Sequence, residues 1–159
     1  MHAPYLAFGL GLVPILTAFA QSKDSFAGVW EAVQVTLVGP QAITIKPGPN
    51  LTIFSARHYS RIDVQTDKPR PVLADPAAAT AEQLRETWGP LVAEAGTYEL
   101  ADNLITLKPV VSKNPAAMAA GAPIVYSYKL EGDTLTLTAQ RDRNGPVANP
   151  VTVKLVRKE

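Results

Sequence analysis

The sequence predicts an all-β, antiparallel domain of about eight strands with one inserted helix. Three observations lead to this prediction: short runs rich in valine and threonine that alternate with period two, turn signals between them, and one helical segment midway along the chain. Antiparallel strands of this number form a closed barrel or a sandwich. Closure removes exposed sheet edges, which favours a barrel for strands joined in sequence order.

The N-terminal twenty residues have the pattern of a secretory signal peptide. Residues 6–19 are almost entirely apolar, and Ala18-Phe19-Ala20 is a small-x-small cleavage site before polar Gln21. The run is short for a membrane span, although an uncleaved N-terminal anchor is the alternative. We therefore expect residues 1–20 to be removed and 21–159 to form one exported domain, periplasmic or extracellular.

Composition excludes several classes of function. The chain has no cysteine, so thiol catalysis, thiolate metal sites and disulfides are absent. Its net charge of +1 comes from dispersed residues, unlike the basic face of a nucleic-acid binder. We expect no metal, no other cofactor, no nucleic-acid partner and no membrane span after signal cleavage. The oligomeric state is left open.

The expected strands follow from alternation and from the turns that bound them. Along residues 28–38, Val29, Val33, Val35 and Leu37 should share one face. The other strands are expected at residues 42–45, 51–54, 59–65, 97–100, 104–110, 125–130, 134–138 and 151–156.

One segment is strongly helical in composition. Asp75-Pro76 supplies an N-cap and a first-turn proline for a helix over 77–88. Thr80 with Gln83 fits a capping box for a slightly later start.

The helix is expected to end or kink soon after residue 88. Gly89-Pro90 should break it, with a further turn to Ala95, and Trp88 should anchor it over one end of the barrel. Residues 114–121 are alanine-rich and are expected to form a short second helix.

Gly28-Val29-Trp30, at the start of the first strand, resembles the lipocalin signature. In lipocalins this tryptophan plugs the closed end of the barrel, and a basic residue near the end of the last strand packs over it. Arg157 stands in that place here, and a guanidinium over an indole is a favourable cation–π contact. The resemblance therefore implies barrel closure by Trp30 and Arg157.

A closer resemblance covers nearly the whole mature chain, to the bacterial lipocalin-like domain family of exported or otherwise uncharacterised proteins. It implies a lipocalin-like barrel with a general role. The sequence differs from true lipocalins in its mid-chain helix and missing cysteines. The matching stretches are Gly28-Val29-Trp30-Glu31, Phe54-Ser55-Ala56-Arg57-His58-Tyr59-Ser60, Lys68-Pro69-Arg70-Pro71, Trp88-Gly89-Pro90, Gly96-Thr97-Tyr98-Glu99 and Lys113-Asn114-Pro115-Ala116.

Five side chains are candidates for lining a ligand site. If Tyr59 and Arg61 face the interior, they can hold a carboxylate or other anionic head group, with Arg61 as bidentate donor. The more apolar Ile62 and Val64 on the opposite face favour the outside for Tyr59 and Arg61. Aromatic packing of the core is the alternative role of the tyrosines. The candidates are Tyr59, Arg61, Tyr98, Tyr126 and Tyr128.

A catalytic arrangement is a weaker hypothesis. His58 could be a general base beside Ser55, Ser60 or Tyr59, with Asp63 orienting it, but a turn histidine bonded to the backbone is favoured. The acids near the predicted helix are expected to be solvated. They are Asp75, Glu82, Glu86 and Glu94.

The sequence therefore predicts an exported lipocalin-like barrel that binds a small, largely apolar molecule in its interior. A packed structural or protein-interaction module of the envelope is the second hypothesis. A barrel isomerase or hydrolase that uses His58 is the third.

Overall fold

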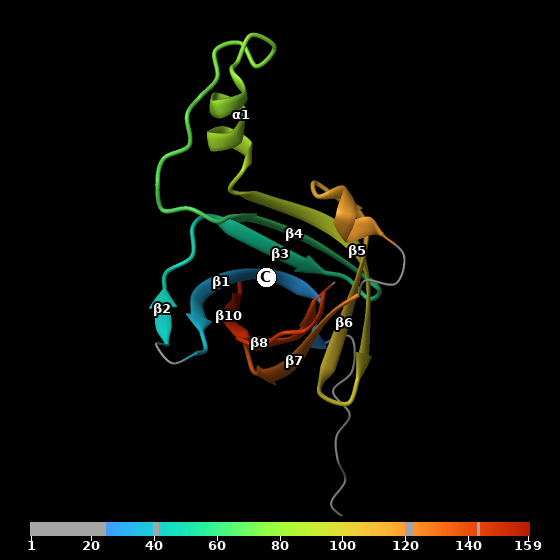
Figure 1. Cartoon of the computed structure of the whole chain (residues 1–159). Helices are drawn as coiled ribbons and strands as arrows, with labels where there is room; N and C mark the ends of the chain where they lie inside the picture. Colours follow the sequence, from blue (N-terminus) through green and yellow to red (C-terminus); the bar gives the residue numbers. More distant parts are fainter. Residues whose placement is uncertain (1–24, 40–41, 120–122, 143) are drawn as a thin grey trace, which may run out of the picture.

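The computed structural model describes residues 25–39, 42–119, 123–142 and 144–159. All its strands belong to one ten-stranded antiparallel sheet, and one α-helix projects from it (Figure 1). The elements are β1 (Gly28–Leu37), β2 (Ile43–Ile45), β3 (Asn50–Phe54), β4 (His58–Val64), α1 (Ala81–Trp88), β5 (Leu91–Ala101), β6 (Leu104–Ser112), the 3₁₀ helix η2 (Pro115–Met118), β7 (Ile124–Glu131), β8 (Thr134–Asp142), β9 (Gly145–Pro146) and β10 (Val151–Arg157).

The sheet closes on itself. The strand order is β10-β1-β3-β4-β5-β6-β7-β8, and β8 pairs back onto β10, which makes a ring of eight strands. Two short strands lie outside the ring, with β2 on β1 and β9 on β8. The predicted all-β barrel of about eight strands is confirmed, and the sandwich alternative is wrong because no pair of edge strands in the ring is left unpaired.

Aromatic side chains fill one end of the barrel, which we call the closed end. It is the end at which β1 begins and β10 finishes. The Phe26 ring lies edge-on to Tyr128, with centroids 4.8 Å apart, and Phe54 lies edge-on to Tyr98 at 5.2 Å. Such edge-to-face pairs stabilise beyond the area they bury.

Trp30 and Arg157 meet at this end. The guanidinium carbon of Arg157 lies 4.2 Å from the Trp30 ring centroid, and Trp30 is fully buried. Arg157 also donates hydrogen bonds to the carbonyl oxygens of Ser25, at 2.6 Å, and Ala27. The residues that precede β1 are thereby held across the closed end.

A bulge in β1 breaks the predicted alternation. The pairing with β10 shifts register between Ala32 and Gln34. The Asn50 side chain accepts a hydrogen bond from the Ala32 amide at 2.7 Å and donates one to its carbonyl at 3.1 Å, replacing a ladder pair. Val29 and Val35 therefore lie on opposite faces, and the prediction of one shared face is wrong.

The inserted helix begins at the later of its two expected starts, and it does not cover the barrel. α1 begins after Thr80, whose side chain and that of Gln83 form the capping box. No α1 residue is buried, and Trp88 is 47% exposed, so the expectation that Trp88 anchors the helix over one end is wrong. The Lys113 ammonium holds the C-terminal end of α1 instead, by donating to the carbonyls of Trp88 and Gly89.

The chain turns into a strand directly after Pro90. A further helical turn to Ala95 was expected, but β5 runs from Leu91 and pairs with β4 through Ala95. The expected short helix in 114–121 is represented by η2 within the described part of that range. The predicted signal peptide lies outside the described residues. Among the described helices, none has the length and apolarity needed to cross a membrane.

Candidate ligand-binding site

At the end opposite the closed end, which we call the mouth, inward-facing side chains reach solvent. Inward-facing side chains at the closed end, such as Trp30 and Ile105, are fully buried. Nearer the mouth, the inward-facing side chains of Arg61 and Asp63 are 25% and 22% exposed. The interior is therefore accessible to solvent at this end of the ring. We call this solvent-accessible part of the interior the cup.

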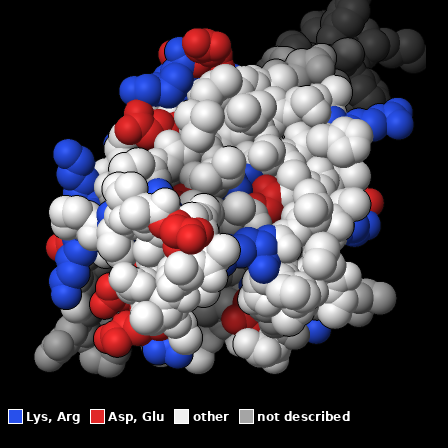
Figure 2. Space-filling view, turned by 90° about the horizontal axis from the view of Figure 1, so that it is seen from above, with Lys and Arg blue, Asp and Glu red and all other residues white. Residues whose placement is uncertain are grey.

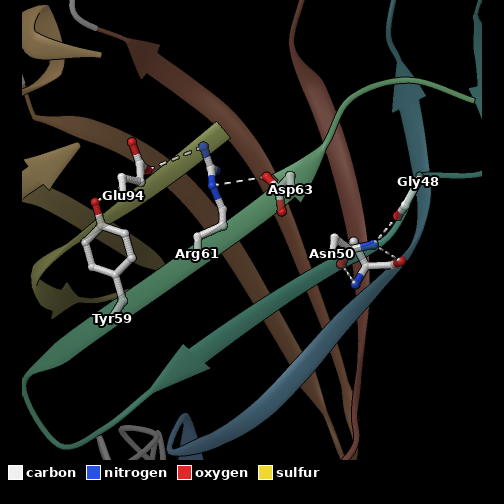
Figure 3. A network of polar contacts seen from close by, with 7 residues as sticks. Gly48, Asn50, Tyr59, Arg61, Asp63 and Glu94 are labelled. Atoms are coloured by element: carbon white, nitrogen blue, oxygen red, sulfur yellow. Dashed lines mark hydrogen bonds and ion pairs between the residues drawn. The ribbon is translucent and has the colours of Figure 1, made fainter. Parts of the chain in front are cut away.

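One wall of the cup carries an inner polar cluster, formed by Tyr59, Arg61, Asp63 and Glu94 (Figure 3). The first three alternate along β4, so they share its inner face, and Glu94 lies directly opposite Arg61 on β5. Arg61 Nε lies 3.2 Å from Asp63 Oδ2, and Arg61 Nη2 lies 3.4 Å from Glu94 Oε1. The Tyr59 hydroxyl donates to the same Glu94 oxygen at 3.4 Å.

Burial and neighbouring charges set the protonation of this cluster. Burial raises the pKa of Tyr59, and the charge of Glu94 raises it further, so the hydroxyl stays a donor. Burial disfavours the charge of Arg61, but Tyr126, Glu94 and Asp63 outweigh it and raise its pKa. Burial also raises the pKa of Asp63 despite the opposing effect of Arg61. Arg61 is therefore a permanent cation with two carboxylates beside it.

The favoured outside placement of Tyr59 and Arg61 is wrong. Tyr59 is 2% exposed, whereas Ile62 on the opposite face of β4 is 51% exposed. The apolar face of this strand points outward because the barrel interior is polar at this level, which reverses the usual rule for a half-buried strand.

Glu94 was missed as a site residue. It was expected among solvated acids near the helix, but it is 8% exposed and lies in the interior on β5. Its signal was the spacing of Glu94, Gly96 and Tyr98, which places all three on one face of an extended strand. The expected helical turn to Ala95 concealed that spacing.

The structure divides the five candidate residues into two groups. Tyr126 lies near Arg61, at the level of Tyr59 and the inner polar cluster. Tyr98 and Tyr128 pack against Phe26 at the closed end, where their hydroxyls donate to the backbone carbonyls of Ser55 and Asp102 at 2.8 and 3.1 Å. Within the first group, Arg61 reaches solvent at the mouth, whereas Tyr59 is 2% exposed and its ring lies 6.5 Å from that of Phe54.

The wall opposite the cluster is apolar. In the ring of eight strands, β8 lies four steps from β4 and β10 lies four steps from β5, so these two strands face the strands of the cluster, and β1 lies beside β10. Val153 of β10 packs against the core and lies directly opposite Val35 of β1, which puts both on the inner face. The same face continues past the ring through three exposed residues, which we call the apolar lip: Leu37, Ile43 and Ile45.

The catalytic grouping around His58 is not assembled. His58 is exposed at the start of β4, and its backbone amide donates to the Ser55 hydroxyl at 3.1 Å. Asp63 lies on the opposite face of β4 and pairs with Arg61. Within the described ranges, no three His, Asp or Glu side chains converge on a possible metal position.

On the face seen from above, the charged side chains do not gather into one patch. Basic and acidic side chains are scattered over the described part of this face with uncharged residues between them (Figure 2). The cup, by contrast, has one polar wall and one apolar wall.

No family model matches the sequence, and no curated protein matches it. Among solved structures, a lipocalin-like protein from Bacteroides uniformis is 15% identical over 85% of this chain and 99% of that chain, with a TM-score of 0.47. A redesigned β-barrel is 11% identical over 90% and 100%, at 0.44. An uncharacterized protein from Bacteroides eggerthii is 9% identical over 82% and 98%, at 0.45.

The chain has a lipocalin-like barrel fold. The closed ring of eight antiparallel strands carries this assignment, together with the packing of Arg157 over Trp30 where the first and last strands meet. The resemblance seen in the sequence is confirmed for the fold.

Proposed function

We propose that this protein binds a small, largely apolar molecule in the cup, as an exported carrier or receptor. The observation that supports this is the exposure of Arg61 and Asp63 on the inner face of a ring whose closed end is fully packed. A preformed concave site with mixed apolar and polar walls is the usual form of a small-molecule site.

Each wall of the cup would contact a different part of the ligand. The apolar body of the ligand would lie against Val35 and Val153 and enter across the apolar lip, at about 25 cal/mol per Å² of apolar area buried, less the ordering terms. The inner polar cluster would fix the orientation of a polar end. The strands are held by continuous pairing around the ring, so the site needs no folding on binding.

Binding of an apolar fluorescent probe tests this proposal. We expect the neutral probe N-phenyl-1-naphthylamine to gain fluorescence with the purified protein and to lose that gain in Val153→Trp, which fills the cup. Lys154→Trp is the matched control, because Lys154 is exposed on the outer face of the same strand. Val153→Phe replaces the first variant if it does not fold.

Absence of probe binding to the native protein, or equal binding by the Val153 and Lys154 variants, would reject the proposal. Native mass spectrometry of the protein from an exporting host supplies an independent result. A co-purified small molecule would name the ligand class.

A second function, as an interaction module, is favoured by the outer face of the barrel. Leu51 and Ile62 pair across β3 and β4, and with Ile53 each is at least 42% exposed. Apolar side chains gathered on one sheet face are typical of protein contacts. Light scattering after size exclusion tests it, since a monomer at all concentrations would contradict self-association through this face.

A further inference from the structure

We propose that the cup selects a ligand with a cationic head group, such as an alkylammonium, rather than an anionic or neutral one. This inference rests on the proposed function, because it names the chemistry of the ligand bound at the same site. It also replaces the expectation that Arg61 would hold an anionic head group.

The positive charge of Arg61 is already paired with acidic side chains of the cluster. It lies within 3.4 Å of Glu94 and 3.2 Å of Asp63, so one guanidinium faces two carboxylates. The Glu94 side chain is only 5% exposed, which places its charge deep in the wall. With both acids ionised the cluster carries a net charge of −1, and Arg61 is the only described basic residue paired with either acid.

The cluster has two open acceptors, beside the Nη donors of Arg61. Glu94 uses one oxygen, Oε1, for both Tyr59 and Arg61, and Asp63 uses Oδ2 for Arg61. Glu94 Oε2 and Asp63 Oδ1 make no hydrogen bond to a described residue. Among described side chains, the only buried polar atom without a hydrogen bond is Arg61 Nε, which faces Asp63. The two free carboxylate oxygens therefore reach the solvent in the cup.

The charge balance decides between ligand classes. An anionic head group would add a third negative charge beside a single cation, at a partly buried site where Coulomb interactions are stronger than in water. An ammonium would bring the cluster to neutrality and donate to the two open oxygens. The apolar wall at Val35 and Val153 is then available for an alkyl chain.

Three ligands of equal chain length test the inference: octylammonium, 1-octanol and octanoate, titrated by calorimetry at neutral pH. We expect octylammonium to bind at least about tenfold more tightly than octanol, with octanoate weakest. Equal affinities, or a preference for octanoate, would overturn the inference and leave the proposed function standing. Failure of all three to bind, together with failure of the fluorescent probe, would remove the proposed function as well.

Two variants show whether the cluster causes the preference. Glu94→Gln should bring octylammonium affinity down to that of octanol while octanol binding stays within about twofold. Glu99→Gln is the matched control, since Glu99 lies on the same strand, faces outward and is 63% exposed on its side chain. Asp63→Asn gives a second measurement if Glu94→Gln does not fold. Retention of the full preference in both cluster variants would overturn the inference.

Discussion

Burial inside the barrel raises the pKa of Asp63 although Arg61 Nε lies only 3.2 Å from its carboxylate. The folded state therefore holds a proton on this group more tightly than the unfolded chain does. The contribution of Asp63 changes between the ordinary pKa of an unfolded aspartate and the raised pKa of the folded state. As pH rises through this window, the group lowers the free energy of unfolding. Above the folded pKa its effect is constant. An ionised Asp63 thus opposes folding at neutral pH.

Asp63→Asn should consequently be at least as stable as the native protein at neutral pH, because asparagine resembles the protonated acid. It should also lose the part of the pH dependence just described. Urea unfolding from mildly acidic to neutral pH measures both. Asp133→Asn is the control, since its side chain is 82% exposed and its ion pair with Arg157 contributes about 0–1 kcal/mol. A loss of more than about 1 kcal/mol in Asp63→Asn would show that the Arg61 ion pair outweighs burial.

Arg157 belongs to the opposite class of residue, one whose contacts favour folding. Arg157→Ala removes the cation–π contact with Trp30 and the hydrogen bonds to Ser25 and Ala27, so we expect a loss of about 2–3 kcal/mol in unfolding free energy. Lys158→Ala should change it by less than about 1 kcal/mol, because that exposed side chain only pairs with Glu31. Similar losses in the two variants would contradict the closure role. Chemical denaturation provides the comparison.

The sequence alone was enough to place some of these side chains and not others. Trp30 and Arg157 stand at recognisable positions, and a guanidinium beside an indole needs no knowledge of strand facing. Arg61 and Ile62 could not be placed, because alternation alone does not tell which face of a strand is inside. The choice was decided by Glu94, a partner 33 positions away along the chain on the neighbouring strand.

At the scale of elements, the segment between β4 and β5 is an insertion with its own bonding. Arg70 donates to the Thr87 carbonyl at 3.3 Å, and the Thr87 hydroxyl donates to the carbonyl of Pro71 at 3.1 Å. The segment returns to its starting point, since the Gln65 amide donates to the Pro90 carbonyl at 2.8 Å. Figure 1 shows α1 projecting away from the ring.

Replacing residues 66–89 with Asn-Gly, together with Pro90→Thr to supply the N–H that closes the turn, should therefore join β4 to β5 as a two-residue hairpin. We expect the unfolding free energy to change by less than about 1 kcal/mol and probe binding to persist, because no α1 residue is buried. Thermal unfolding and the fluorescence titration give the two answers. A folded variant that no longer binds the probe would instead make this segment part of the site.

The strands were predictable as elements, and their irregularities were not. Most strands alternate clearly and end at glycine, asparagine or aspartate turns. The first part of β5 has Ala93 and Ala95 on its outer face and Glu94 on its inner face, so no apolar contrast marks it as a strand. The bulge in β1 depends on Asn50, which is distant in sequence, and local patterns carry no trace of it.

At the scale of the whole molecule, the barrel has two unlike ends. The closed end is a core of buried aromatic and aliphatic side chains, whereas the cup combines a charged wall with an apolar wall. The number of strands and their sequential order left a barrel and a sandwich open, and the lipocalin-like resemblance favoured the barrel. The polarity of the interior was not predictable, because it requires the facing of every strand around the ring at once.

The closed end also gathers both ends of the described chain. The Val29 amide donates to the Glu159 carbonyl at 2.9 Å, and Arg157 binds the Ser25 carbonyl at 2.6 Å. A tether that follows Glu159 is consequently oriented. A fusion partner, an affinity tag or a solid support joined after Glu159 lies beside the closed end, and the mouth is at the opposite end of the barrel.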